Sequence, residues 1–224
     1  MQRMTFQRAR SVEQRQVRRQ AILDTAASML AEMPVAEVSL NEMSRRVGLA
    51  KSNVLRYFES REAVLLELLD GALQAWLAEI SDELAASVDP QLSARERGDQ
   101  LAAVLSRSLA GATTLCDLIN AQPGVLEHNV SVDVVVHYKR SALHLLATMI
   151  DLVRSHLPEL RDHARMVCMT TLILAGALST YGRPSASTLA AYEVDPTLAE
   201  LHLDLASMLE SAVGTLITGA LASD

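Results

Sequence analysis

The sequence is poor in the residues that typically build β-sheets, disulfide frameworks and heavily looped domains. Its 224 residues include only two phenylalanines, one tryptophan, two cysteines and six prolines. Strands favour aromatic and β-branched residues, so the shortage of aromatics points away from a sheet protein. Half of the residues are hydrophobic, which is ample for a packed core. An all-α fold is therefore predicted.

The two cysteines, Cys116 and Cys168, lie far apart and outside any C-x-x-C pattern. They fit a reducing compartment and do not suggest a disulfide framework. A metal site that combined them with His128, His137 or His144 would depend on tertiary structure alone, and a histidine in the interior or lining a pocket is the commoner case. We predict neither a metal nor a cofactor.

The arrangements that catalysis requires are also missing. No nucleophile with its base, no pair of carboxylates and no glycine-rich phosphate loop has the required spacing. The sequence therefore predicts a protein that is not an enzyme.

Long apolar runs and a secretory signal are missing as well. Residues 1–20 are rich in arginine, and the longest strongly apolar stretch, residues 166–178, is too short to span a bilayer. A mitochondrial transit peptide shares such a start, but the first folded helix is predicted to begin inside it. We therefore expect a cytoplasmic protein with no membrane partner.

The formal charge of −7 is unevenly distributed along the chain. Residues 1–64 contain eleven basic and seven acidic side chains, a net of +4, whereas the remainder contains nine basic and twenty acidic ones, a net of −11. The basic end suits DNA, and the acidic remainder repels it. This distribution predicts that any DNA binding is confined to the N-terminal end.

Residues 39–58 have the pattern of two short helices separated by Gly48. Ser39 and Glu42 have the spacing of a capping box, in which each side chain accepts from a backbone amide at the helix start. Glycine adopts a left-handed backbone at little cost, so Gly48 predicts a sharp turn into the second helix. The inward face of the first helix would consist of Leu40, Met43 and Val47.

The second helix has a narrow apolar stripe and a polar remainder. Ala50, Val54 and Phe58 recur every four residues, although Ala50 is a poor N-cap. In a major groove, arginine recognises guanine, asparagine recognises adenine, and lysine, serine and tyrosine reach phosphates. The side chains available for these contacts are Lys51, Ser52, Asn53, Arg56 and Tyr57. The alternative is an ordinary helical corner with a solvated polar face.

Together with residues 59–65, this segment resembles the signature of the TetR family of bacterial repressors. In that family a short recognition helix with an aromatic end precedes a turn and a basic-acidic pair, which correspond here to Tyr57-Phe58 and Arg61-Glu62. Two departures stand out: Ala50 occupies a position where the family usually has serine or threonine, and Leu55 one where it often has tyrosine. The first removes a cap and a phosphate contact, and the second offers an apolar contact to a thymine methyl.

The resemblance implies an all-α protein of about nine helices with two domains. Residues 1–64 are expected to form a three-helix, helix-turn-helix DNA-binding domain with a basic N-terminal arm, and residues 65–224 an effector-binding and dimerisation domain. The arm, residues 1–10, either follows a minor groove or is a solvated tail.

The function expected from the resemblance is ligand-responsive transcriptional regulation, with repression favoured over activation. The protein would bind double-stranded operator DNA of palindromic sequence as a homodimer and would be released by a small-molecule effector. The alternative is an all-α small-molecule-binding or enzymatic protein whose basic end is not used on DNA.

Three sets of site residues follow from position. Expected DNA contacts come from Ser39, Arg45, Lys51, Ser52, Asn53, Leu55, Arg56 and Tyr57. The effector pocket implied by the resemblance would be lined by Trp76, Cys116, Asn120, His137, Tyr138, Met166, Met169 and Thr170. The implied dimer interface would contain Leu172, Leu205, Met208, Leu209, Ala212 and Leu216. For the pocket, the alternative is that methionine and tryptophan simply fill the core.

Apolar periodicity and capping residues predict the remaining helices. The first would run from Ser11 to about Glu32, with Arg15, Arg18 and Arg19 near the phosphates. An exposed stretch through Gly98 would separate later helices, and a loop over residues 182–195 would precede the last one. The helices expected after the motif are 60–84, 101–109, 112–121, 132–156, 161–181 and 196–221.

Overall fold

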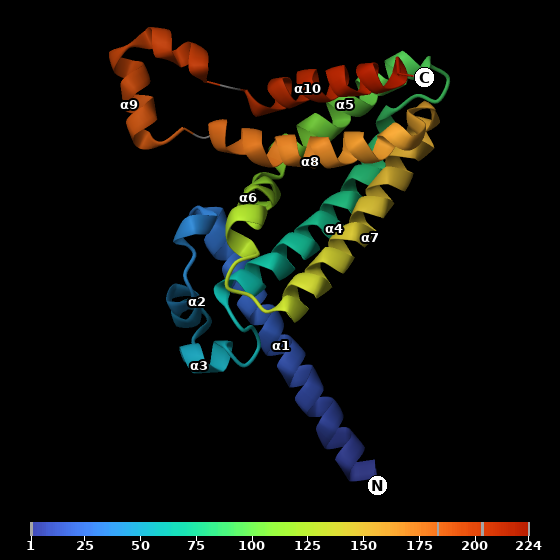
Figure 1. The fold of residues 1–224 in the computed structure, drawn as a ribbon. Coiled ribbons are helices and arrows are strands. Elements are labelled where there is room, and N and C mark those ends of the chain that lie inside the picture. The colour runs from blue at the N-terminus through green and yellow to red at the C-terminus, as the bar shows by residue number, and fades with distance from the viewer. Residues whose placement is uncertain (1, 183, 203, 224) are drawn as a thin grey trace. The chain divides into compact units, whose positions relative to one another are not determined.

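A computed structural model describes residues 2–182, 184–202 and 204–223, with side chains in the first helix described from residue 13 onward. Every regular element in these ranges is helical (Figure 1), which confirms the all-α prediction. The α-helices are α1 (Gln2–Glu32), α2 (Leu40–Val47), α3 (Lys51–Val54), α4 (Arg61–Ser87), α5 (Ala94–Gly111), α6 (Thr113–Ala121), α7 (Val132–His156), α8 (Ala164–Tyr181), α9 (Ala186–Val194) and α10 (Leu205–Leu221). The short 3-10 and π turns are η1 (Val35–Glu37), η2 (Gln122–Leu126), η3 (Pro158–His163) and η4 (Pro196–Leu201).

The chain divides into two compact units. The first contains residues 1–68 and 121–138, and the second contains residues 69–120 and 139–224. Helices α4 and α7 each pass from one unit into the other. Apolar side chains that are almost fully buried form the core of the first unit: Ile22, Ala26, Met29, Val38, Met43, Val54, Phe58, Val64 and Leu65.

Helix α1 begins at Gln2, nine residues before the predicted start at Ser11. The sequence contains neither glycine nor proline before Pro34, so nothing in it interrupts a helix there. The predicted start, where Ser11 and Gln14 have the spacing of a capping box, therefore lies inside the helix. The predicted arm is helical where the structure describes it, and Met1 lies outside the described residues.

In the second unit α10 packs against α5 and α8 (Figure 1). Helix α5 begins at Ala94, which corrects the exposed stretch predicted through Gly98. Ser93 and Glu96 form a complete capping box there, because the Glu96 amide donates to Ser93 Oγ at 3.3 Å and the Ser93 amide donates to Glu96 Oε2 at 3.0 Å. Gly98 is buried against α10, since a Cβ at that position would lie 2.9 Å from Cγ2 of Ile217.

The region between α8 and α10 also differs from the prediction. The expected loop contains α9, which is capped by Ser185 and rich in alanine, a strong helix former. The expected last helix is interrupted at His202, whose backbone is extended, and α10 starts anew where Asp204 accepts from the Ser207 amide at 2.9 Å. Helix α9 has no buried residue and extends beyond the ends of α8 and α10 (Figure 1).

Replacing Gly176 of α8 by alanine should destabilise the protein by about 1–3 kcal/mol. A Cβ at Gly176 would lie 2.9 Å from Ile119 Cγ2 and 3.1 Å from the backbone nitrogen of Asn120, which cannot yield easily. Gly71 of α4 is the matched control: it has open space around it, so Gly71→Ala should stabilise by about 0.4–1 kcal/mol. Urea unfolding measures both, and equal effects of the two variants would contradict the packing described.

Among the described residues, one helical stretch, Pro158–Tyr181, is long and apolar enough to cross a bilayer by length and composition, and a second passes only if the sharply bent pair Ala94–Gly111 and Thr113–Leu126 is counted as one. The prediction considered only residues 166–178, whereas the structure continues that segment backward through η3. The backbone at Arg161 is not helical, with φ 45° and ψ −122°, so the stretch is kinked near its start. A core helix of a globular protein passes the same test, so its composition does not assign it to a membrane.

Candidate nucleic-acid interface

The helix-turn-helix is built as the sequence predicts at α2 and the turn. The Glu42 amide donates to Ser39 Oγ at 3.2 Å, and Gly48 has φ 71°, in the left-handed region. Only half of the predicted capping box forms, because the Glu42 carboxylate binds arginines instead of the Ser39 amide. Met43 is fully buried, and Ser44 is buried where α2 lies close to its neighbours.

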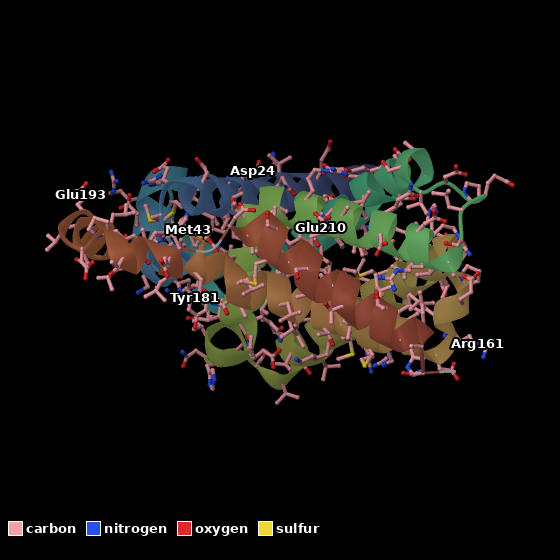
Figure 2. The ribbon with its side chains drawn as sticks, turned by 90° about the horizontal axis from the view of Figure 1, so that it is seen from above. Asp24, Met43, Arg161, Tyr181, Glu193 and Glu210 are labelled. Carbon is pink, nitrogen blue, oxygen red and sulfur yellow. The ribbon has the colours of Figure 1, made fainter. Side chains whose placement is uncertain are left out.

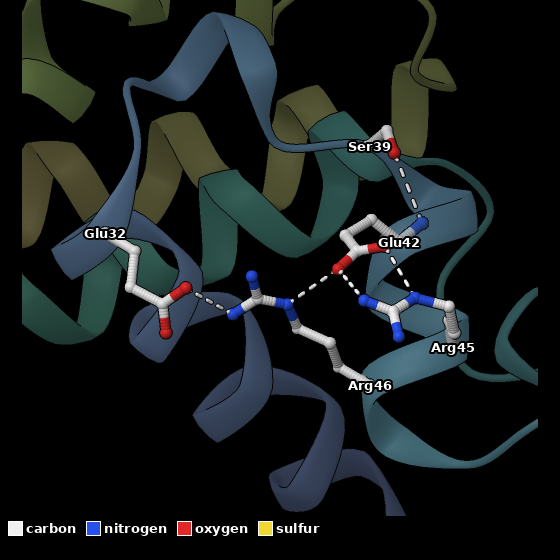
Figure 3. Close-up of polar contacts among 5 residues, drawn as sticks. All are labelled: Glu32, Ser39, Glu42, Arg45 and Arg46. Atoms are coloured by element: carbon white, nitrogen blue, oxygen red, sulfur yellow. Dashed lines mark hydrogen bonds and ion pairs between the residues drawn. The ribbon is translucent and has the colours of Figure 1, made fainter.

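Glu42 is the centre of an ion-pair network on α2 (Figure 3). Arg45 donates to its carboxylate from Nε at 2.8 Å and from Nη2 at 2.5 Å, and Arg46 donates from Nε at 2.9 Å. Arg46 also reaches Glu32 at the end of α1, at 2.7 Å. The pair uses two of the five N–H donors of Arg45, so the others remain available to a phosphate.

Hydrogen bonds from Arg45, and then from Arg46, lower the pKa of Glu42 from 4.5 to about 2. A depressed carboxyl pKa stabilises the folded state at pH above about 4.5, and this contribution is lost as the pH falls through about 2. We expect a carboxyl NMR titration of Glu42 to give a midpoint near 2, and Arg45→Gln to raise it. A midpoint near 4.5 in the intact protein would show that the network does not persist in solution.

Helix α3 is shorter than predicted, because regular helix ends at Val54 and residues 55–57 form a turn. Ala50 is the N-cap and makes no side-chain cap bond, as its lack of a polar side chain requires. Val54 and Phe58 are buried as predicted, but Ala50 is exposed. Two buried side chains, Val54 and Phe58, therefore hold this segment against the core, instead of the three predicted.

The eight predicted DNA-contact residues lie on α2, on α3 and in the flanking turns. Seven are exposed and Tyr57 is partly exposed. Lys51, Ser52 and Asn53 occupy the first turn of α3, and Leu55 and Arg56 follow directly. These five residues lie on a segment of six and comprise two cationic side chains, two neutral hydrogen-bonding side chains and one apolar side chain. Such a combination is suited to contacts with base edges and phosphates.

Arg61, at the start of α4, holds the chain that enters the helix-turn-helix. Its Nη1 donates to the carbonyl of Val38 at 2.9 Å and to that of Ala36 at 3.3 Å, while its Nε binds Glu62 at 3.1 Å. The basic-acidic pair noted in the sequence thus fixes the backbone just before Ser39.

Arg19, predicted to lie near the phosphates, has its hydrogen-bond partners inside the protein. Its guanidinium binds both carboxylate oxygens of Glu67 and the carbonyl of Tyr57, within its own unit. Arg15 and Arg18 are exposed, as that prediction requires. The sequence missed the role of Arg19 because its partners lie 38 and 48 residues away.

The predicted pocket residues are divided between the units. His137 and Tyr138 belong to the first, and the other six belong to the second. Trp76 and Cys116 are buried, with Trp76 Nε1 donating to Ser108 Oγ at 3.0 Å, whereas Met166 and Met169 are exposed. No group of three or more His, Cys, Asp or Glu residues suited to a metal occurs among the described residues.

Two buried hydroxyls in the second unit were not predicted from the sequence. Ser106 and Thr171 have no exposed surface, and neither hydroxyl has a hydrogen-bond partner among the described residues. Apolar residues lie three and four positions from each of them in the sequence, and this helical spacing could have predicted that they are buried. An open groove of about 860 Å³ in this unit is lined by residues of α5 and α10, and none of the eight predicted residues lines it. Its lining residues are Arg95, Asp99, Ala102, Ser207, Glu210, Ser211, Gly214, Thr215, Thr218 and Gly219.

Among the predicted interface residues, Leu209 has no exposed surface and so packs inside its own subunit. Met208 is exposed, and the remaining four, Leu172, Leu205, Ala212 and Leu216, are partly exposed.

Comparison with known proteins places both parts of the chain. Residues 22–68 match the family described as "Bacterial regulatory proteins, tetR family", and residues 70–224 match "Tetracyclin repressor-like, C-terminal domain". The HTH-type transcriptional regulator EthR of Mycobacterium tuberculosis is 42% identical over 50 residues, which are 22% of this chain and 23% of EthR. That match therefore covers less than a quarter of either protein.

Solved structures with the same fold include two proteins named FadR. The Bacillus subtilis protein, in complex with stearoyl-CoA, is 13% identical with a TM-score of 0.53 and covers 89% of this chain and 98% of its own. The Bacillus halodurans protein is 14% identical with a TM-score of 0.50 and covers 89% and 97%. At these identities the likeness concerns the fold alone. The two family matches span nearly the whole chain, and it therefore belongs to the TetR family of bacterial transcriptional regulators, which bind DNA and are not enzymes.

Proposed function

We propose that this regulator is a repressor that binds a palindromic operator as a homodimer and is released by a small-molecule effector. Residues 1–64 would read the DNA, and residues 65–224 would dimerise and bind the effector. The observation that carries the proposal is that the polar side chains of the segment Lys51–Tyr57 face solvent while Val54 and Phe58 are buried and hold the segment in a helix-turn-helix. Since operator DNA lies on the chromosome, the protein would act in the cytoplasm.

Within the reading segment, Asn53 and Arg56 are the proposed base contacts. Lys51 and Tyr57 are the proposed phosphate contacts, with Ser39, Arg45 and Ser52 adding others and Leu55 facing a thymine methyl. Their exposure and their chemistry support these assignments.

The proposed homodimer explains apolar side chains that a single subunit leaves exposed. On α8, Met166, Met169 and Ile173 recur at helical spacing and are 44%, 40% and 61% exposed. Met208 of α10 is also exposed, and α9 exposes Leu189 and Val194. Figure 2 labels Tyr181, the exposed end of α8, and Glu210 on α10. A second copy that covers α8 and α10 would remove the exposed apolar groups of these two helices from water.

The proposed effector binds in the helical core of the second unit. Two unpaired buried hydroxyls, Ser106 and Thr171, support this, because a bound polar group would satisfy them. Since the core is rich in leucine, alanine and methionine, we expect an aliphatic or mixed molecule. Bacillus subtilis FadR was crystallised with stearoyl-CoA, so acyl-CoA esters belong among the first compounds to test.

Release would be transmitted by α4, which passes from the reading unit into the effector-binding unit. A tilt of α4 would change the position of the reading segment relative to that of the partner subunit. An effector that prefers the non-binding arrangement by about 1.4 kcal/mol would lower DNA affinity tenfold.

The effector proposal is tested by titrating the protein–operator complex with acyl-CoA esters and with metabolite extract from the native host. Fluorescence anisotropy of labelled operator should show release by at least one fraction. Operator binding that no extract, ester or metal ion alters would leave a constitutive repressor.

A further inference from the structure

Arg19 joins three parts of the reading unit that are distant in sequence. From α1, its Nη1 donates to the Tyr57 carbonyl at 2.7 Å, and its Nε donates to Glu67 Oε1 at 3.1 Å, with Nη2 binding the other carboxylate oxygen. Its guanidinium carbon also lies 4.1 Å from the centre of the Phe58 ring. One side chain thus contacts the end of the recognition segment and α4 simultaneously.

The recognition segment needs such a support because it is short. Helix α3 has four residues, and a helix of that length is not stable by itself. After Val54 the turn is closed by the Tyr57 and Phe58 amides, which donate to the Val54 carbonyl at 2.9 and 3.1 Å. The Tyr57 carbonyl lies beyond that turn and accepts from Arg19.

We propose that Arg19 is a positioning residue that fixes the recognition segment to α4 through Glu67. The proposal rests on the proposed function, and it adds the contact by which a displacement of α4 reaches Asn53 and Arg56. Glu67 is the last ionisable residue of α4 inside the reading unit, directly before the helix enters the second unit. A bidentate arginine–carboxylate pair has a fixed geometry, so movement of Glu67 moves Arg19 and the Tyr57 carbonyl with it.

Glu67→Gln tests the proposal, because a purely electrostatic role and a positioning role of Glu67 predict opposite changes in operator affinity. Removing an acid from a DNA-binding unit should raise affinity for every duplex if charge alone matters. If Glu67 holds Arg19 in place, operator affinity should instead fall about tenfold, within the usual range of coupling between sites, while affinity for random duplex does not fall. Glu37→Gln, an exposed acid in the same unit, is the matched control and should not lower operator affinity.

Arg19→Lys tests the other partner, because lysine keeps the charge but cannot make the three-way contact. We expect Arg19→Lys to lose a similar amount of operator affinity without a change in the slope of log affinity against log salt. The double variant with Arg19→Lys and Glu67→Gln should lose no more operator affinity than either single variant. Retained affinity in Arg19→Lys, together with a salt slope reduced by about one in Arg19→Gln, would make Arg19 a phosphate contact and overturn the proposal.

The same measurements separate failure of this inference from failure of the proposed function. If the wild type prefers no duplex sequence, the proposed function fails. If the wild type binds an operator and Glu67→Gln binds it equally well or better, the positioning role of Arg19 fails. Loss of operator and random binding together would indicate general damage to the reading unit and would likewise overturn the specific role.

Discussion

Ile173→Asp is expected to produce a monomer that binds the operator at least a hundredfold more weakly than the wild type. Ile173 is more exposed than Met166 and Met169, the other two apolar side chains of α8 that the proposed partner subunit would cover. By two-fold symmetry the dimer would bury two unpaired carboxylates, each at a cost of about 3–5 kcal/mol, and every 1.4 kcal/mol is a factor of about ten. Sedimentation at micromolar concentration measures the assembly, and anisotropy measures the affinity.

Leu143→Asp is the matched control for that experiment. Leu143 is an exposed leucine on α7, outside the proposed interface. A carboxylate there should therefore change neither the mass of the assembly in sedimentation nor the operator affinity. Position 209 is unsuitable for the test, because Leu209 is fully buried and a charge there would unfold the subunit. A wild type that sediments as a monomer at micromolar concentration would end the dimer proposal.

Substitutions in the recognition segment are expected to separate base contacts from phosphate contacts. Asn53→Ala should cost about 1–3 kcal/mol of operator binding and relax the preference at one base pair. Lys51→Ala should weaken binding to all duplexes alike and reduce the slope of log affinity against log salt by about one. Binding to a set of singly substituted operators at several salt concentrations measures both effects.

Gln16→Ala is the control for Asn53→Ala, since it removes an exposed amide from α1 in the same unit. It should change neither affinity nor preference. If Asn53→Ala retained full selectivity at every base pair, Asn53 would not be a base contact.

The helix-turn-helix could be predicted from sequence because its determinants are local. Ser39 caps its own helix, Gly48 takes the left-handed turn, and Val54 lies in register with Phe58. The family resemblance rested on the same few residues, and the fold of the remainder followed from membership more than from pattern. The local pattern was misread at Gly98, which was assigned to an exposed stretch although it lies inside α5 and packs closely against Ile217.

The roles of Arg19, Glu42 and Leu209 could not be predicted because they depend on tertiary neighbours. Arg19 was assigned to DNA by its charge, yet its partner Glu67 lies 48 residues away. Glu42 had the spacing to bind the Ser39 amide, but two arginines on its own helix compete for the carboxylate. Leu209 lay on a broad apolar stripe of α10, and only packing distinguishes the side that faces its own subunit.

The central claim, that a homodimer reads a palindrome through α3, is tested most directly by selecting bound duplexes from a random pool at about physiological salt. We predict enrichment of an inverted repeat with half-sites about 34 Å apart, or a multiple of that distance, bound by two subunits or an even number. In the same selection, the Asn53→Ala variant should enrich the same inverted repeat but with no base preference at one position of each half-site. Enrichment of no sequence, or of a single site occupied by one subunit, would contradict the account.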